Sequence, residues 1–370
     1  MNKTSIIILS YNTYLLTKQC IESIRKYTDA GSYEIIVVDN HSQDPSVGWL
    51  KKQADLKVIY NKENAGFPKG CNQGMAIAEQ GNDILLLNSD TIVTPHWLEN
   101  LQTALYSDKT IGVAGCVTNS CSNWQQVEVN YKNLDELMDF ARAVNQSNKN
   151  LWEIRPRLVG FCYLIKNEVY RQLGGLDEQF SPGNYEDDDY SLRVIMAGYK
   201  LLLCRDSFIH HYGSASFAKA HDEVKQAQKI KKYNTLLRRN KDLFLKKWQV
   251  TESYGAIHQV VFEVDLPAQA SPRIFVIGCS MGMDLCYLKN KYPHAELSGV
   301  TENWAEAALA GKLFDVCYCP DTENDVFVLL TGKYNYILLA DEQKKYQDFD
   351  GYINKLFPYL AADGSIHISQ

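Results

Sequence analysis

Residues 5–12 read SIIILSYN, a run of apolar, mostly β-branched residues that ends in three polar ones. The same pattern returns in residues 34–42, EIIVVDNHS, and in residues 83–90, DILLLNSD. A shorter run, KVIY, occupies residues 57–60. Segments that are apolar along their length are typical of strands buried on both faces, as in a parallel sheet.

Segments with a helical pattern separate these runs, at Leu15–Tyr27, Val47–Ala54 and Lys69–Glu79. Strands that alternate with helices predict an α/β fold, in which ligands bind beyond the carboxyl ends of the strands. All four strands are followed by polar groups: Ser10-Tyr11-Asn12, Asp39-Asn40-His41-Ser42, Asn61–Gly66 and Asn88-Ser89-Asp90. Any one group could simply cap a helix or form a turn. Four in succession on one edge predict a binding site.

The composition is that of an ordinary globular protein, with 45% hydrophobic and 22% charged residues, and excludes disordered and fibrous classes. No apolar run reaches the roughly 18–20 residues of a membrane span, and no secretory signal precedes the first strand. The ten cysteines form no CxxC pair, so we expect reduced thiols and a cytoplasmic location. A domain-wide basic excess is missing, so we expect no nucleic-acid partner.

The charge pattern and a second α/β pattern divide the chain. Residues 218–250 carry ten basic and three acidic side chains, a net charge of +7. Further strands are predicted after them at residues 273–277, 296–300, 334–339 and 364–369. We predict an α/β domain at residues 1–217, a basic helical connector at 218–270 and a smaller α/β domain at 271–370.

The motifs of residues 4–217 resemble those of the family 2 glycosyltransferases with the GT-A fold, a Rossmann-like mixed sheet. They are closest to the rhamnosyltransferase-like branch of surface-polysaccharide enzymes. Besides the strand ends, the matching motifs are Asn64-Ala65-Gly66-Phe67 with Asn72, Leu173–Glu178, Glu186–Asp189 with Arg193 and Gly198, and His210 with Gly213-Ser214. The resemblance implies a nucleotide-diphosphate sugar donor, with UDP- or dTDP-sugars favoured.

The resemblance implies a divalent metal at the end of the fourth strand. The family has an Asp-x-Asp motif there, whereas this chain has Asn88-Ser89-Asp90, so Asp90 is the inferred metal ligand. His210 resembles the family's late metal-ligating histidine, and His211 is the neighbouring alternative. Oxygen ligands with one imidazole suit Mn²⁺ or Mg²⁺, which neutralises a leaving diphosphate without proton transfer. The other interpretation is that Asn88–Asp90 caps the next element.

The resemblance also implies donor-binding residues. Asp39 would accept a hydrogen bond from the nucleobase imide, which uracil and thymine share. The other inferred donor-binding positions are Ser10, Tyr11, Asn12, Asn64, Gly66, Phe67, Lys69, Asn72, Asn88, Ser89 and Asp90. Lys69 is a phosphate partner in one interpretation and a solvated surface lysine in the other.

The acidic cluster Glu186–Asp189 supplies the catalytic half of the inferred site. Inverting transfer needs a base that takes the proton of the acceptor hydroxyl, and the resemblance assigns this role to Asp187. Glu186 would orient the acceptor, and Asp189 would cap the following helix around Arg193. Four adjacent carboxylates should raise at least one pKa by like-charge repulsion. A solvated acidic turn is the alternative.

Residues 273–370 resemble class I S-adenosylmethionine-dependent methyltransferases through the glycine-containing turn at 278–282 and the segment 362–368. The likeness is incomplete. Thr301 follows the second strand where that family has an acidic residue, with Glu302 one place late, and the chain stops before the last two strands of that fold. We therefore expect neither methyl transfer nor bound S-adenosylmethionine, and interpret this part as a scaffold or a docking module for a protein partner.

The whole sequence predicts an inverting, metal-dependent glycosyltransferase that modifies a hydroxyl of a glycan or lipid-linked saccharide in bacterial surface-polysaccharide synthesis. The alternatives are a bifunctional glycosyltransferase and methyltransferase, or an inactive sugar-nucleotide-binding assembly subunit. The connector has two interpretations. It is either a helix that packs its apolar stripe on its own domains or a basic face that docks on anionic lipid at the inner face of the cytoplasmic membrane.

Overall fold

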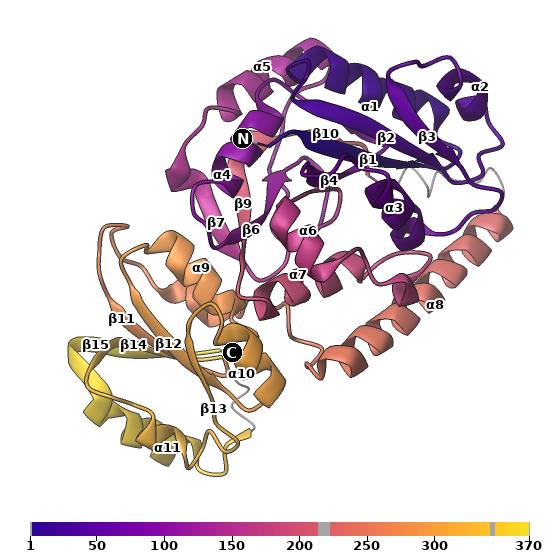
Figure 1. The fold of residues 1–370 in the computed structure, drawn as a ribbon. Helices are drawn as coiled ribbons and strands as arrows, with labels where there is room; N and C mark the ends of the chain where they lie inside the picture. The colour runs from indigo at the N-terminus through magenta and orange to yellow at the C-terminus, as the bar shows by residue number, and fades with distance from the viewer. Residues whose placement is uncertain (1, 214–222, 341–344, 370) are drawn as a thin grey trace. The chain divides into compact units, whose positions relative to one another are not determined.

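The computed structural model describes residues 2–213, 223–340 and 345–369. The chain divides into two compact units, one made of residues 1–153 and 157–243 and the other of residues 154–156 and 244–370 (Figure 1). The domain limits at residues 217 and 270 stay a prediction. Among the helices of the described ranges, none combines the length and the apolar content that a membrane span requires.

The first unit is built on a sheet of eight strands in the order β3-β2-β1-β4-β8-β6-β9-β7. Its first four strands are parallel neighbours: β1 (Thr4–Ser10), β2 (Tyr33–Asp39), β3 (Leu56–Tyr60) and β4 (Asp83–Asn88). They confirm the four strands predicted from the apolar runs. Strand β8 (Cys162–Ile165) runs antiparallel to both β4 and β6 (Ile111–Val117), so the sheet is mixed.

Strand β1 is buried because helices cover both faces of the sheet. Figure 1 shows α1 (Tyr14–Tyr27) and α3 (Phe67–Ala76) on opposite sides of β1 and β2. Helix α3 approaches β1 closely, since a Cβ atom added to Gly70 would lie only 2.3 Å from Cδ1 of Leu9. Because Gly70 has no side chain, α3 and the loop that precedes it can pack closely against the carboxyl end of β1.

The remaining elements up to residue 211 complete the first sheet and its cover. The helices are α2 (Ser46–Leu50), α4 (Trp97–Leu105), α5 (Leu134–Val144), α6 (Asn167–Leu173) and α7 (Glu186–Met196), with 3₁₀ turns η1 (Lys149–Leu151) and η2 (Glu178–Phe180). The strands are β5 (Thr91–Ile92), β7 (Trp152–Arg155), β9 (Lys200–Phe208) and β10 (His210–His211). Strands β5 and β10 pair antiparallel, with His211 opposite Thr91, and this pairing brings residues 210–211 to the end of β4.

Helix α8 (Glu223–Trp248) occupies about half of the predicted basic connector, whose residues 218–222 lie outside the described ranges. Asn240 on α8 is completely buried. Its Nδ2 group donates hydrogen bonds of 2.7–3.0 Å to three backbone carbonyls, those of Phe180, Gly183 and Asn184. Helix α8 thereby supports the loop that leads into α7.

Six basic side chains of α8 are exposed. These are Lys231, Lys232, Arg238, Arg239, Lys246 and Lys247, whereas Phe244 is completely buried. A buried aromatic agrees with the packing interpretation of the connector, and an exposed basic face agrees with the lipid-docking one. Both interpretations therefore stay predictions.

The second unit is built on five parallel strands in the order β13-β12-β11-β14-β15. The strands are β11 (Arg273–Ile277), β12 (Glu296–Thr301), β13 (Asp315–Tyr318), β14 (Tyr334–Leu339) and β15 (Leu360–Ile368). The helices are α9 (Met283–Lys291), α10 (Trp304–Ala310) and α11 (Phe349–Leu356), with 3₁₀ turns η4 (Gln259–Glu263), η5 (Val326–Val328) and η7 (Phe357–Tyr359). The α/β prediction for this part is confirmed, although β13 was not predicted.

Both faces of the second sheet carry a core. Ile274 and Val276 of β11 pack with Leu285 of α9, and the alternate residue Phe275 packs with Leu356 of α11. Figure 1 accordingly shows α9 and α11 on opposite sides of the sheet. The order of the strands reverses at β11, and such reversals leave a crevice at the carboxyl edge.

Candidate functional site

Three strand ends of the first sheet lie in one row. Ser10 is the register partner of Asp39 on β2, and Leu9 is the partner of Asn88 on β4. Because the strands are parallel, the residues that follow them emerge at the same edge. Ser10 itself is used within the fold, since its Oγ shares a hydrogen bond of 2.9 Å with Oγ1 of Thr17. The edge therefore presents Asp39 on one side and Asn88 on the other side of the segment that follows Ser10.

Asp39 presents one carboxylate oxygen without a donor. The residue is only 1% exposed, and its Oδ2 accepts the N–H of Ser42 at 3.1 Å. Its Oδ1 is buried, and no group in the described part of the chain donates to it. Such an oxygen costs about 1–3 kcal/mol if it stays unsatisfied. Oδ1 is therefore suited to a ligand that supplies an N–H.

The loops around Asp39 are fixed by three asparagines. The N–H of Asn12 donates to Oγ of Ser42 at 3.0 Å, and Oδ1 of Asn12 accepts the N–H of Gln43 at 2.7 Å. Asn40 was not among the predicted site residues. Its Nδ2 donates to Oδ1 of Asn64 at 2.8 Å, and its own Oδ1 accepts the N–H of residue 65 at 2.8 Å. Asn12 and Asn64 thus shape the loops, and Asn40 links two strand ends.

The loop before α3 turns sharply at Gly66. Its φ of +83° favours glycine, and a Cβ atom there would lie 2.9 Å from Cα of Pro182. The N–H of Phe67 donates to the carbonyl of Pro182 at 2.8 Å. Lys69, two residues further on, is exposed at the start of α3. The loop that carries the inferred donor contacts is therefore held against the segment that leads to α7.

Three other predicted donor residues have distinct environments. The side chain of Asn72 bonds both backbone groups of Leu176, donating to its carbonyl at 2.9 Å and accepting its N–H at 2.8 Å, and so serves the fold. Oγ of Ser89 lies 3.3 Å from Oγ1 of Thr13. Tyr11 is 43% exposed, so its ring is open to a planar partner.

Asp90 lies beside His211 at the end of β4. Nε2 of His211 is 3.2 Å from Oδ1 of Asp90 and 3.4 Å from Nδ2 of Asn88. Nδ1 of His211 donates to the backbone carbonyl of Ser120 at 2.7 Å, and a carbonyl can only accept. In the neutral imidazole, the lone pair is therefore on Nε2, facing Asp90. Burial would lower the pKa of His211, but the hydrogen bond and charge of Asp90 raise it above its ordinary value.

His210, the histidine that the sequence suggested first, faces elsewhere. Its Nδ1 lies 2.6 Å from the hydroxyl of Tyr131. Burial, with the adjoining His211, lowers the pKa of His210. Adjacent residues of a strand point to opposite faces, so only one of the two histidines can face Asp90. In the structure that residue is His211.

Asp90 and His211 form a pair and not a complete metal cage. Across residues 2–213, 223–340 and 345–369, no group of three or more His, Cys, Asp or Glu side chains is arranged to hold a metal ion. Mg²⁺ that acts with phosphates usually has one or two protein carboxylates and takes its other oxygens from substrate and water. One carboxylate with one imidazole lone pair fits a metal that arrives with a diphosphate.

Two carboxylates of the acidic cluster have arginine partners. Nη1 of Arg157 donates to both oxygens of Asp188, at 2.9 and 2.8 Å. Nε of Arg193 donates to Oδ2 of Asp189 at 3.0 Å, one turn further along α7. All four acidic residues lie in the first turn of α7, where the helix dipole favours negative charge. The cluster therefore holds two structural ion pairs and two carboxylates available for other roles.

Asp187 is held by backbone groups. Its Oδ2 accepts the N–H of Gly160 at 2.8 Å, and its Oδ1 accepts the N–H of Asp188 at 3.0 Å. Burial, and then the charge of Asp188, raises the pKa of Asp187 to about 6. The sequence predicted a raised pKa from charge repulsion, whereas in the structure burial is the larger cause. Asp187 is therefore a fixed carboxylate with an enhanced affinity for a proton.

Glu186 is more deeply buried, at 7% exposure. No group in the described chain donates to its Oε2. Burial, together with the charge of Asp187, raises the pKa of Glu186 well above its ordinary value. A carboxyl group in such a position tends to be protonated and able to donate a hydrogen bond.

Residues 160 and 161 connect the two halves of the site. Gly160 binds Asp187, as described above, while the carbonyl of Phe161 accepts the N–H of Asn88 at 2.9 Å. The ring of Phe161 stacks on the imidazole of His211 with ring centroids 5.3 Å apart. Adjacent residues of one segment therefore touch the acidic cluster on one side and the Asp90–His211 pair on the other. No sequence motif marked residues 157–161, although they join the site.

Residues 5–174 match the family described as glycosyl transferase family 2. The uncharacterized protein y4gI of Sinorhizobium fredii is 24% identical over 263 residues, covering 66% of this chain and 27% of that protein. The O-antigen chain rhamnosyltransferase RfbN of Salmonella typhimurium is 23% identical over 223 residues, covering 56% of this chain and 66% of RfbN. The matched segments therefore span about a quarter of the length of y4gI and about two thirds of RfbN.

The chain is also similar to a solved structure, that of GalNAc-T7 with UDP, GalNAc and Mn²⁺. The sequence identity is 18% and the TM-score is 0.47, and the match covers 57% of this chain and 44% of that one. The family match covers Asp39, Asn88 and Asp90 and the segment at 160–161, and ends before Asp187 and His211. The similarity to glycosyl transferase family 2 thus extends over residues 5–174, a little less than half of the chain.

Proposed function

We propose that the protein is an inverting, metal-dependent glycosyltransferase of the GT-A fold that moves a sugar from a nucleotide-diphosphate donor to an acceptor hydroxyl. The observation that carries this proposal is the segment 160–161, which ties Asp187 to the Asp90–His211 pair. A carboxylate of raised pKa next to a metal-binding pair is what transfer to a hydroxyl with loss of a diphosphate requires.

The nucleotide would bind at the ends of β1 and β2. Oδ1 of Asp39 would accept the imide N–H of uracil or thymine, which favours UDP- or dTDP-sugars. The exposed ring of Tyr11 would stack on the base, because planar bases pack well on aromatic faces. The exposed Lys69 is positioned near the turn at Gly66, as a phosphate partner would be.

The metal would be held by Oδ1 of Asp90 and Nε2 of His211, which already face each other. We assign this role to His211 and not to His210, because His210 is bonded to Tyr131. A bound Mn²⁺ or Mg²⁺ supplies charge neutralisation of the leaving diphosphate. Asn88 would bond the ribose or the diphosphate from the same strand end.

In the transfer step, Asp187 takes the proton of the acceptor hydroxyl while the hydroxyl oxygen bonds to the anomeric carbon. The bond from that carbon to the diphosphate oxygen breaks, and the nucleotide diphosphate leaves with the electron pair. Because the pKa of Asp187 is near 6, it is a stronger base than an ordinary aspartate and still ionised at neutral pH. Glu186 would orient the acceptor hydroxyl from its buried position.

Transfer should therefore depend on pH through Asp187. Only the ionised carboxylate accepts a proton, so the rate at saturating donor should level off above about pH 7. It should fall about tenfold per unit below the pKa of about 6. An aspartate with an ordinary pKa would hold the rate level down to about pH 5. The measurement is kcat from pH 5 to 8, with the affinity for UDP at each pH as the control. A level rate between pH 7 and pH 5 would contradict the role of Asp187.

The likeness to an O-antigen chain rhamnosyltransferase supports a glycan or lipid-linked saccharide as acceptor, in bacterial surface-polysaccharide synthesis. The test of the function is a screen of UDP- and dTDP-sugars for release of nucleotide diphosphate, with Mn²⁺ or Mg²⁺ and with EDTA. Metal-dependent release supports the proposal. No release from any donor would instead favour the inactive assembly subunit. Titration with S-adenosylmethionine tests the bifunctional alternative, which an absence of binding would remove.

A further inference from the structure

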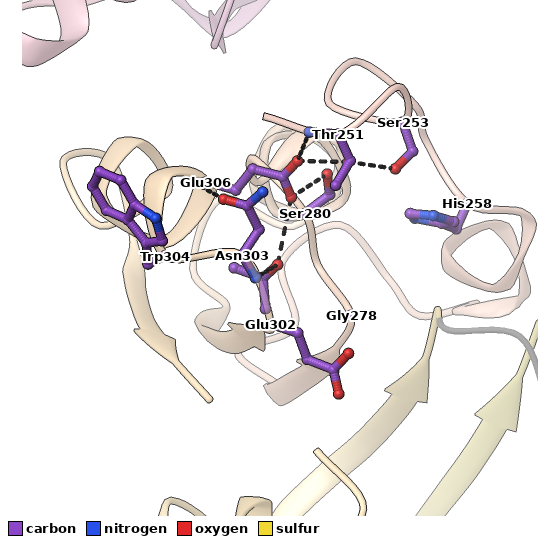
Figure 2. Close-up of a pocket in the computed structure, with 10 residues that line it drawn as sticks. Thr251, Ser253, His258, Gly278, Ser280, Glu302, Asn303, Trp304 and Glu306 are labelled. Atoms are coloured by element: carbon purple, nitrogen blue, oxygen red, sulfur yellow. Dashed lines mark hydrogen bonds between the residues drawn. The ribbon is translucent and has the colours of Figure 1, made fainter. Parts of the chain in front are cut away.

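The second unit contains a pocket of about 380 Å³ that no function above uses. Its walls come from residues 251–258, from the turn after β11 and from residues 301–306 after β12 (Figure 2). It therefore lies at the carboxyl edge of a parallel sheet, beside the strand where the order reverses. This is the edge at which open α/β sheets bind their ligands.

The floor of the pocket is a buried carboxylate. Glu306 is only 2% exposed, and Figure 2 shows its bonds to residues on two sides. Its Oε1 accepts the N–H and the Oγ1 hydroxyl of Thr251, at 2.7 and 2.6 Å, and its Oε2 accepts the hydroxyl of Ser280 at 3.0 Å. With the hydroxyl of Thr301, which lies 3.5 Å from Oε2, four donors compensate the buried carboxylate without removing its charge. The glycine-containing turn at Ser280 thus faces a fixed negative group.

The charged side chains of the lining disfavour anions. Of the described residues that line the pocket, two are carboxylates, Glu302 and Glu306, and none is Lys or Arg. Glu302 has a cationic neighbour, since its Oε1 lies 2.7 Å from Nζ of Lys345, whereas the donors to Glu306 given above are neutral. A phosphate in the pocket would lie next to Glu306 in partly buried surroundings, where like charges repel strongly.

The rim supplies one flat surface and one fixed polar ring. Trp304 is 58% exposed, and Figure 2 places it on the opposite side of Glu306 from His258. Nδ1 of His258 lies 2.7 Å from Oδ2 of Asp284, which is completely buried, so the imidazole has a fixed orientation. Hydroxyl groups in the lining and two carboxylates can accept and donate hydrogen bonds within the same small space.

We propose that this pocket binds an unphosphorylated, uncharged ring with neighbouring hydroxyl groups, as found in a saccharide residue or a nucleoside. The ring hydroxyls bond the carboxylate and hydroxyl lining, and the flat face packs on Trp304. Glu306 rejects the phosphorylated forms of the same compounds. The proposal does not rest on glycosyl transfer, because binding is measured without a sugar nucleotide.

The test is titration of the 370-residue protein, followed by ligand-observed NMR, with two matched pairs of probes. The pairs are adenosine with AMP, and methyl α-D-glucopyranoside with its 6-phosphate. We expect at least one uncharged member to bind and its phosphorylated partner to bind at least tenfold more weakly. Binding of adenosine alone identifies the nucleoside as the source, and binding of the glycoside alone identifies the saccharide. If neither uncharged compound binds, or if a phosphorylated partner binds equally well, the proposal is overturned.

The location is tested with two variants that each remove a similarly exposed aromatic ring. Trp304→Ala removes the exposed ring at the rim, and Phe357→Ala removes a ring that is 55% exposed and does not line the pocket. We expect Trp304→Ala to weaken binding at least tenfold and Phe357→Ala to leave it unchanged, with thermal unfolding measured for both. Equal affinities in the two variants would place the ligand elsewhere. Loss of sugar transfer is not a readout here, so failure of this proposal leaves the proposed function untouched.

Discussion

Replacing Asp187 by Asn is expected to slow sugar transfer about 10²-fold or more while nucleotide-sugar affinity stays within twofold. The amide cannot take the acceptor proton, and general base catalysis contributes about 10²–10⁴ to a rate. A 10²-fold loss corresponds to about 2.7 kcal/mol of activation free energy. The measurement is transfer by single-turnover kinetics, alongside donor affinity by titration calorimetry.

The structure defines the controls for Asp187→Asn. The new amide can keep one of the two backbone hydrogen bonds but turns an NH₂ group toward the other donor, so thermal unfolding must be compared with the wild type. Asp135→Asn, in the first turn of α5, makes the same charge change on an exposed carboxylate and should leave transfer unchanged. Wild-type transfer by Asp187→Asn would exclude it as the base.

Replacing Asp90 by Ala is expected to abolish the metal dependence of donor binding. In the wild type, Mn²⁺ should strengthen the binding of UDP at least tenfold, about 1.4 kcal/mol, because a metal held by Asp90 and His211 would neutralise charge on the diphosphate. In Asp90→Ala, the affinity should be equal with Mn²⁺ and with EDTA. Titration calorimetry of UDP under both conditions makes the comparison. A metal dependence that survives in Asp90→Ala would remove Asp90 from the site.

The two adjacent histidines provide a matched pair for the same experiment. His211→Ala should reproduce most of the Asp90→Ala effect, because Nε2 of His211 faces Asp90 at 3.2 Å. His210→Ala loses its bond to Tyr131 and should keep the metal dependence. If His210→Ala lost the metal dependence and His211→Ala kept it, the metal ligand would be His210, as the sequence suggested first.

The sequence predicted the strands of the first sheet because each is a continuous apolar run. It also predicted that Asp39 and Asn88 share an edge, since parallel strands end together. The sequence could not decide which of the two adjacent histidines, His210 or His211, faces Asp90. The two histidines form strand β10. Its pairing with Thr91–Ile92, more than a hundred residues earlier in the chain, determines which of them points toward Asp90.

Other parts of the site depend on similarly distant contacts. Asn72 resembles a donor-binding residue by motif, yet its amide bonds the backbone of Leu176, 104 residues further on. Arg157 neutralises Asp188 from a segment without a recognisable pattern. Strand β13 (Asp315–Tyr318) escaped prediction because it is short and mostly exposed, with little apolar signal. Patterns of hydrophobicity indicate elements, whereas the partners of polar side chains follow from the assembled fold.

The hydrogen bonds of Asn240 decide where the chain can be cut. A fragment that ends at residue 217 would contain every side chain assigned to sugar transfer, and its limits would match the resemblance to the family. It would also lack α8, leaving three backbone carbonyls of the loop before Glu186 without their donor. Water could then bond these carbonyls, but the loop would lose three hydrogen bonds that fix it in place, each worth about 0.5–1.5 kcal/mol net. A truncated enzyme for crystallisation or screening should therefore extend at least through residue 243, where the first compact unit ends.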